Sequence, residues 1–238
     1  MYGGKEIRMQ YNIFGGNLPA VTITLNPGES IYTQSGGMSW MTAGVQMDTN
    51  MKGGLLKGLG RMLSGDSLFI ATYSATAANQ EITISSTFPG EIVAVNPAGG
   101  DIIAQKSAFL CAESGVSVSA HVVKNLSAGL FGGEGFVLQR LSGNGLVFLE
   151  IDGAVCEKTL AAGESLIVDT GSIAAYEARM QYEVTMVRGF KNVLFGGEGL
   201  LNTRLTGPGK VWLQTMTMPG FAKRIIPFLP KPTSTSSN

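Results

Sequence analysis

The sequence predicts an all-β protein of three similar units, on the strength of two repeated phrases and the spacing of its strands. A glycine turn with one acid and a fresh apolar run occurs three times, and its acids are Asp66, Glu134 and Glu198. A second glycine phrase precedes each copy, with the acids Glu29, Asp101 and Glu164. Each second-phrase acid stands 37, 33 or 34 residues before its partner. Two phrases in one order at near-constant spacing indicate a short unit that was copied twice.

The residues between the phrases have the patterns of strands and tight turns. Residues 20–25 alternate apolar and polar with period two, as a half-buried strand does. The following Pro27-Gly28 pair suits a type II turn. Such runs recur about every ten residues with little convincing helix, which favours small β-sandwich or β-barrel units.

We expect strands in each third of the chain and divide the chain accordingly. The expected strands are 7–13, 20–25, 30–34, 38–42, 68–74 and 80–85, then 90–95, 101–105, 108–112, 116–123, 136–141 and 146–151, then 154–160, 164–169, 173–178, 182–188, 200–205 and 210–217. The expected units are 7–77, 78–151 and 152–218, followed by a C-terminal segment and polar tail over 219–238.

Composition restricts the classes of partner. Hydrophobic residues make up 44% of the 238-residue chain, and charged residues only 14%, against about 25% in an average soluble domain. So few charges suggest that some surface is covered by other subunits. The 17 basic and 17 acidic residues give a formal net charge of zero. Without a positive field to attract phosphate backbones, nucleic acid is not the expected partner.

Residues 51–63 form the most unusual stretch of the first unit. Its leucines fall at helical spacing, while its basic residues lie on another face. Four glycines cost an isolated helix about 1 kcal/mol each. One interpretation is a short helix or ordered loop docked on a sheet, and the other is an amphipathic patch that touches a membrane or a partner. The candidate contact residues are Leu55, Leu56, Leu59, Lys57 and Arg61.

The C-terminal segment 219–230 is apolar, basic and broken by prolines. It suits a helix of one to two turns at 220–226 that packs on the core. The alternative is a docking segment for another protein, with Phe221, Ile225 and Phe228 as contacts. Residues 231–238 are polar and are expected to be disordered.

The two cysteines, Cys111 and Cys156, make no disulfide framework. A disulfide between them is one reading, and two free buried thiols in a reducing cytoplasm is the reading we favour. The N-terminus has no apolar signal core, and no apolar run reaches the ~18 residues of a membrane span. We therefore expect a cytoplasmic protein.

The residue inventory argues against catalysis, a metal and a cofactor. His121 is the sole histidine, and the chain has neither Cys-x-x-Cys nor Gly-x-Ser-x-Gly. A Cys111–His121 dyad is disfavoured because Cys111 lies in an apolar strand. The Gly-Gly-Glu-Gly turns lack the lysine and the helix of a phosphate loop. We expect no catalytic residue, no metal and no cofactor.

The acids of the first phrase are the remaining candidates for a specific role. Around a pseudo-threefold axis, Asp66, Glu134 and Glu198 would be equivalent. They could bind a cation or pair with basic residues, for which the candidates are Arg61, Arg140 and Arg204. The simpler interpretation is that each acid accepts hydrogen bonds from the backbone of its own turn. Threefold repetition favours this structural duty.

The order of these motifs resembles the AIM24 family over residues 7–226. The resemblance rests on the triplicated glycine phrases, Trp40 after Gly36-Gly37, the stretch 53–61 and the Phe-Gly-Gly-Glu-Gly turns. It implies three β-sandwich units of double-stranded β-helix topology around a pseudo-threefold axis. Each would be similar to the subunit of the tryptophan-RNA-binding attenuation protein. The family has no accepted catalytic motif, and a shared fold does not fix function.

We therefore expect a non-enzymatic scaffold or interaction module, with other proteins or further copies of itself as partners and a membrane surface as a further option. The alternative is a small-ligand module that uses clefts between the β units.

Overall fold

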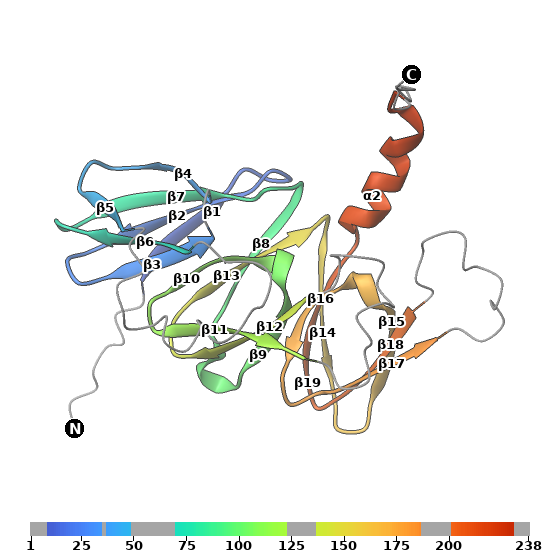
Figure 1. The fold of residues 1–238 in the computed structure, drawn as a ribbon. Helices are drawn as coiled ribbons and strands as arrows, with labels where there is room; N and C mark the ends of the chain where they lie inside the picture. Colours follow the sequence, from blue (N-terminus) through green and yellow to red (C-terminus); the bar gives the residue numbers. More distant parts are fainter. Residues whose placement is uncertain (1–8, 35–36, 49–69, 123–136, 187–200, 231–238) are drawn as a thin grey trace, which may run out of the picture.

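The structure is a computed structural model that describes residues 9–34, 37–48, 70–122, 137–186 and 201–230 (Figure 1). In these residues, nineteen strands form four antiparallel sheets, and one α-helix follows them. The expected all-β class is confirmed. The first strand, β1 (Gln10–Phe14), precedes three successive sets of six strands.

The strands of the three sets are as follows. The first set is β2 (Ala20–Leu25), β3 (Ser30–Gln34), β4 (Met38–Met41), β5 (Val45–Asp48), β6 (Ile70–Ala75) and β7 (Gln80–Ser85). The second set is β8 (Gly90–Val95), β9 (Ile102–Gln105), β10 (Phe109–Glu113), β11 (Val116–His121), β12 (Leu138–Gly143) and β13 (Val147–Asp152). The third set is β14 (Val155–Leu160), β15 (Ser165–Asp169), β16 (Ile173–Glu177), β17 (Gln181–Met186), β18 (Leu201–Thr206) and β19 (Gly209–Gln214).

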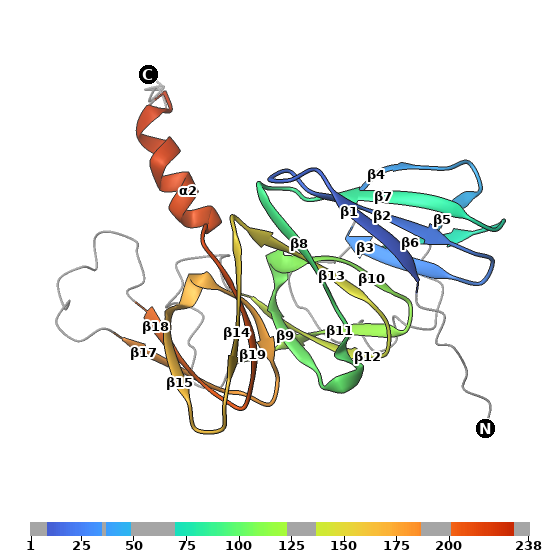
Figure 2. The ribbon, with the colours of Figure 1, turned by 180° about the vertical axis from the view of Figure 1, so that it is seen from behind.

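Short helices complete the described chain. Single-turn 3-10 helices are η1 (Pro97–Gly99), η2 (Lys106–Ala108), η3 (Thr170–Ser172) and η4 (Ile226–Phe228). The α-helix α2 (Met218–Ile225) begins after Thr217, whose hydroxyl accepts a hydrogen bond from the Gly220 amide, and has Pro219 in its first turn. It extends away from the sheets in both views (Figures 1 and 2).

The three sets share one pairing scheme. In each set the first strand pairs with the sixth and the second with the fifth. The third strand also pairs with the sixth, and the fourth with the fifth. Each set therefore contributes two three-stranded half-sheets. One half holds its first, sixth and third strands, and the other holds its second, fifth and fourth.

Neighbouring sets join their half-sheets edge to edge. β10 of the second set pairs with β3 of the first, and β16 of the third set pairs with β9 of the second. These junctions produce the two six-stranded sheets β5-β6-β3-β10-β13-β8 and β11-β12-β9-β16-β19-β14. The remaining sheets are β1-β2-β7-β4 at one end and β15-β18-β17 at the other.

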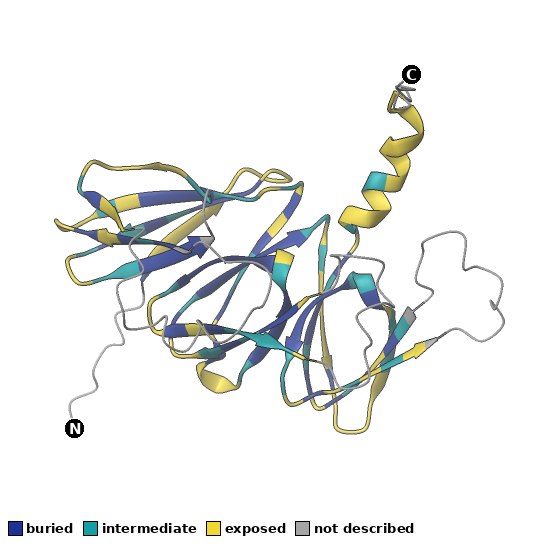
Figure 3. Ribbon diagram, viewed as in Figure 1, coloured by how far each residue is buried: buried dark blue, intermediate teal, exposed yellow. Residues whose placement is uncertain are grey.

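The buried residues, which Figure 3 colours dark blue along the strands, form three apolar clusters. The first combines the alternating residues of β2 and β7 with Phe148 of the second set. The second combines β13 and β11 residues with Trp212 of the third set. The third includes Ile103 and Tyr176 together with Leu205. Each cluster draws on more than one set, and the second draws on all three through Tyr32 of β3. Apolar burial, at about 25 cal/mol per Å², therefore stabilises the junctions as well as the sets.

The local strand predictions agree closely with the structure, whereas one unit boundary was wrong. The expected strands 20–25, 30–34, 80–85 and 90–95 match β2, β3, β7 and β8 to the residue. The boundary at 77/78 assigned β7 to the second unit, but β7 pairs with β2 and β4 of the first set. The turn before it joins the two half-sheets of one set and does not separate two sets.

Two further differences concern β5 and α2. The sequence did not indicate β5, a four-residue strand that buries only Val45. The C-terminal helix forms where it was expected, but it does not pack on the core, since none of its residues is buried. Its ring contact with the body is between Phe221 and Phe88, whose centroids lie 4.9 Å apart.

Candidate functional site

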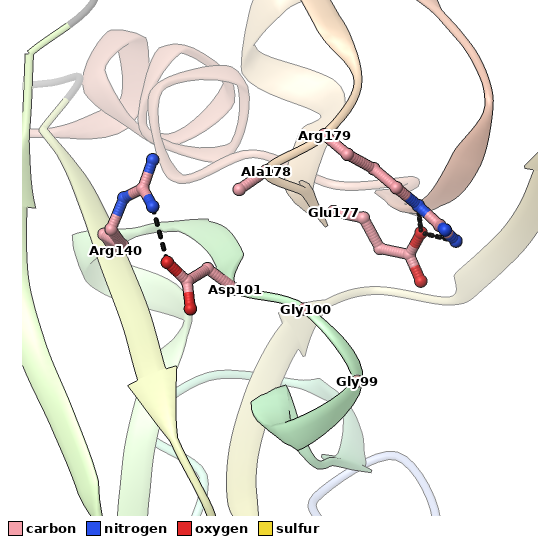
Figure 4. Close-up of a pocket in the computed structure, with 7 residues that line it drawn as sticks. All are labelled: Gly99, Gly100, Asp101, Arg140, Glu177, Ala178 and Arg179. Atoms are coloured by element: carbon pink, nitrogen blue, oxygen red, sulfur yellow. Dashed lines mark hydrogen bonds and ion pairs between the residues drawn. The ribbon is translucent and has the colours of Figure 1, made fainter.

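A cavity of about 260 Å³ lies beside the junction of the second and third sets (Figure 4). Its walls come from the turn before β9, from the centre of β12 and from the turn that joins β16 to β17. The lining residues are Gly99, Gly100, Asp101, Arg140, Glu177, Ala178 and Arg179. Ligand pockets usually exceed about 300 Å³, so this cavity suits a molecule no larger than an amino acid.

Two ion pairs flank this cavity, with Ala178 between them in Figure 4. On one side the Arg140 guanidinium donates to the Asp101 carboxylate across two elements of the second set. On the other side Arg179 donates from Nε and Nη2 to Glu177 Oε2, at 2.8 and 2.6 Å. The four charges balance, so the cavity can offer both a cation and an anion site to one ligand.

The Asp101 position departs from the pattern that the repeated phrases suggested. Glu29 and Glu164 each close their own turn by accepting from the amides of Asn26 and Ala161, at 2.7 and 2.8 Å. Strand register aligns Ile31, Ile102 and Leu166, because each pairs with the corresponding residue of the fifth strand. Asp101 therefore lies one residue later than Glu29 and Glu164. The shift frees its carboxylate to pair with Arg140.

The three acids proposed as axial residues lie outside the described part of the chain. Asp66, Glu134 and Glu198 belong to residues that the structure does not describe, as do Leu55, Leu56, Leu59, Lys57 and Arg61. Of the basic residues suggested as their partners, Arg140 pairs with Asp101 and Arg204 lies exposed on β18.

A second cavity, of about 460 Å³, lies where the first strands of the second and third sets begin. Its lining is mostly backbone and small residues, among them Gly90 and Gly153. Gly90 approaches β13 so closely that a Cβ would lie 1.9 Å from the Ile151 carbonyl oxygen. The carboxylate in its wall, Glu91, accepts a hydrogen bond from the Val155 amide at 2.9 Å. This cavity therefore offers a ligand little charge.

The sequence analysis missed a buried carboxylate on β13. Glu150 is buried and accepts hydrogen bonds from Ser86 Oγ, from the Thr87 amide and from Thr87 Oγ1, at 2.9, 2.8 and 3.1 Å. The sequence feature that could have identified it is a single acid inside the otherwise apolar run 147–151. Burial, with Glu150 as the second cause, raises the pKa of the neighbouring Asp152 to about 6. Glu150 fixes the turn between the first and second sets.

The nucleophile and base candidates of the described chain are poorly disposed for catalysis. The Cys111 thiol is fully buried, and burial raises its pKa well above the ordinary value. Burial and the nearby Arg140 lower the pKa of His121. Cys156 is a free thiol as well, but it is exposed, so the expectation that both thiols are buried was wrong for this residue. The described residues contain no group of three potential metal ligands.

An exposed apolar surface lies on α2 and η4, which Figure 3 colours almost entirely as exposed. Of the three predicted contact residues, Phe221 and Ile225 are about two-fifths exposed and Phe228 is 86% exposed. The surface residues of this segment are Met218, Phe221, Ile225, Ile226, Phe228 and Leu229. Lys223 and Arg224 lie in the last turn of the helix.

The helices of the described residues include none that is long and apolar enough to cross a bilayer.

Comparison with known proteins places the chain in a family. It is 29% identical to an uncharacterized protein of Streptococcus pyogenes serotype M6 over 240 aligned residues, covering 97% of this chain and 94% of the relative. A Streptococcus pyogenes protein known from an X-ray crystal structure superposes with a TM-score of 0.75 at 26% identity, covering 93% of this chain and all of that one. The family model described as "Mitochondrial biogenesis AIM24" matches residues 11–216. The chain therefore belongs to the AIM24 family.

Proposed function

We propose that this protein is a non-enzymatic scaffold that attaches to a membrane surface through α2 and η4. The observation that carries this proposal is the exposed apolar surface on these two helices. A helix that lies in a membrane interface buries large apolar side chains and keeps basic residues near the lipid headgroups. Phe228, Ile226 and Leu229 supply the apolar side chains, and Lys223 and Arg224 supply the charge.

Two other features support a structural role. The buried thiol of Cys111, with its raised pKa, is a poor nucleophile. The first, second and third sets repeat one pairing scheme, and we propose that each is a small β-sandwich unit of the kind that the family resemblance implies. A free exposed thiol at Cys156 fits a reducing, cytoplasmic setting.

Flotation with lipid vesicles tests the attachment. Wild-type protein is mixed with vesicles of phosphatidylcholine and phosphatidylserine and centrifuged in a density gradient. We expect the wild type to float, and an Ile226→Ser/Phe228→Ser variant to stay at the bottom, because both side chains are exposed and neither supports the fold. The control is Leu18→Ser, at an apolar residue in the turn before β2 whose exposure lies between those of Ile226 and Phe228. Failure of the wild type to float would remove the membrane proposal, as would flotation of the double variant.

The second candidate function is binding of a small zwitterion, and the cavity with two ion pairs favours it. An amino acid would place its carboxylate at Arg140 or Arg179 and its ammonium group at Asp101 or Glu177. A thermal-shift screen with the standard amino acids tests this function. A binding amino acid should raise the unfolding midpoint by several degrees. The rise should vanish in Arg140→Ala and persist in Arg204→Ala, and a flat screen would exclude the class.

A further inference from the structure

Each six-stranded sheet is a union of two half-sheets from successive sets. In both, the strand order begins with the fourth, fifth and second strands of one set and ends with the third, sixth and first strands of the next. The terminal sheets are the two halves that have no partner. β17-β18-β15 is the first kind of half, and β4-β7-β2, extended by β1, is the second kind. The open edges of these halves are β15 and β4, whose counterparts in the other sets pair with each other at the two internal junctions.

β4, the free edge strand, has the same register irregularity as β10 and β16, the equivalent strands of the other two sets. β4, β10 and β16 each carry a register shift at the same point against the sixth strand of their set, between Met38 and Trp40 in β4. The register aligns Trp40 with Cys111 and Ala175. Trp40 is 56% exposed, whereas both counterparts are completely buried. β4 therefore has the same bulge as β10 and β16 although no strand pairs with its outer edge among the described residues.

The free edge β15 shows the same contrast. Pairing with the fifth strand aligns Ile167 with Tyr32 of β3 and Ile103 of β9. Tyr32 and Ile103 are buried where β10 and β16 pair beside them, whereas Ile167 is 59% exposed. Large apolar side chains are rarely placed on an open strand edge, since such an edge invites pairing with another chain.

Some of the other edges carry charge. The outer strands β14 and β8 carry Glu157, Lys158 and Glu91, charges that protect an edge from unwanted pairing, whereas the outer strands β1 and β11 carry no Asp, Glu, Lys or Arg. β4 has no charged residue, and the one charge of β15 is Asp169 at its end. No proline blocks either strand.

One copy cannot join its own two edges in the arrangement observed. β4 and β15 lie at opposite ends of the molecule in both views (Figures 1 and 2). Among the described residues, β4 pairs only with β7 and β15 only with β18. The complementary edge must then come from another molecule, and the same chain carries both edges.

We propose that β15 of one copy pairs antiparallel with β4 of a second copy. The two internal junctions fix the register. Ala112 faces Tyr32 and Tyr176 faces Ile103, so Met41 faces Ile167 of the neighbouring copy. The amides of Ser114 and Ala178 donate to the carbonyls of Ser30 and Asp101. In the proposed junction, the Ala43 amide of one copy would donate in the same way to the Ser165 carbonyl of the other.

The new junction completes a sheet of the order β17-β18-β15-β4-β7-β2-β1. This order repeats that of the two internal sheets, with β1 added at the end. The contact is heterologous, so it generates a closed ring or an open array of copies. It does not involve α2 or η4 and therefore does not depend on the proposed membrane attachment.

Two charge variants, alone and mixed, test the junction. Ile167→Glu should prevent pairing at the β15 edge and leave the β4 edge unchanged. Trp40→Glu should prevent pairing at the β4 edge and leave the β15 edge unchanged. Sedimentation velocity over a range of concentrations should show the wild type above the 25.0 kDa of one chain. Each variant alone should sediment as one chain. Their mixture should form a two-chain species, because one intact edge of each kind remains, and this recovery also shows that both variants are folded.

The matched control is Met47→Glu, at another exposed apolar residue of an edge strand, β5. It should assemble like the wild type, as should Ile226→Ser/Phe228→Ser. A wild type that remains one chain at every concentration would overturn the proposal. So would variants that assemble normally on their own, a mixture that stays monomeric, or loss of assembly in Met47→Glu.

Discussion

Ile167 and Ile103 hold the same register position in β15 and β9, yet Ile167 is 59% exposed and Ile103 is 1% exposed. The sequence around them does not produce this difference, since both strands are short apolar runs beside a fifth strand of the same kind. The strand on the other side produces it. β16 covers β9, while β15 pairs only with β18 among the described residues.

The buried carboxylate of Glu150 should be important for stability. Glu150→Ala leaves the Thr87 amide and hydroxyl without their acceptor, whereas Ser86 Oγ can still donate to the Phe88 carbonyl. We expect a loss of about 3 kcal/mol in the free energy of unfolding, measured by urea denaturation. Glu183→Ala, on the exposed face of β17, should change it by less than about 0.5 kcal/mol. Equal effects of the two substitutions would contradict the role assigned to Glu150.

Asp152 should make stability fall as the pH rises. Burial and Glu150 raise its pKa from 3.8 to about 6 in the folded state, so the folded protein holds the proton more tightly than the unfolded chain. The unfolding free energy then decreases with pH between those two values and levels off above them.

Asp152→Asn removes this dependence. Relative to the wild type, the variant should gain stability between about pH 3 and about pH 8, with the change centred between 4 and 6. The effect is moderated by partial solvent exposure of the carboxylate. Denaturation curves at several pH values measure it, and a difference between the two proteins that is constant with pH would contradict the assignment.

The two thiols should differ sharply in reactivity. Cys156 is exposed, whereas Cys111 is buried and its pKa is raised. A chromogenic disulfide reagent should therefore label one thiol per native chain and two in denaturant. Cys156→Ser should abolish the native reaction. Labelling of both thiols under native conditions would show that the strand around Cys111 opens readily.

The strands were predictable because their signal is local. Alternation over 20–25 and 80–85 identifies a half-buried strand without knowledge of its neighbours, and β2 and β7 have those bounds. Which edges pair is not local information. The short β5, with one buried residue, carries no periodic signal, and the boundary at 77/78 failed because a turn between half-sheets resembles a turn between units.

The candidate site was less predictable for a related reason. The phrase acids were aligned by spacing, but a shift of one residue turns a strand residue to the other face. Asp101 is shifted in this way, and its pairing with Arg140 appears only once β9 and β12 are in register. Phe221, Ile225 and Phe228 were identified from composition and are exposed, and their role as contact residues stays a prediction.

Chemical cross-linking between β4 and β15 tests the central claim of head-to-tail pairing most directly. In a Cys156→Ser background, Met41→Cys and Ile167→Cys are introduced into one chain and treated with a short thiol-to-thiol cross-linker. We predict a ladder of covalent multimers on a denaturing gel, and no ladder from the control pair Met47→Cys and Ile167→Cys. A double variant that yields only single chains, or an equal ladder from the control pair, would contradict the account.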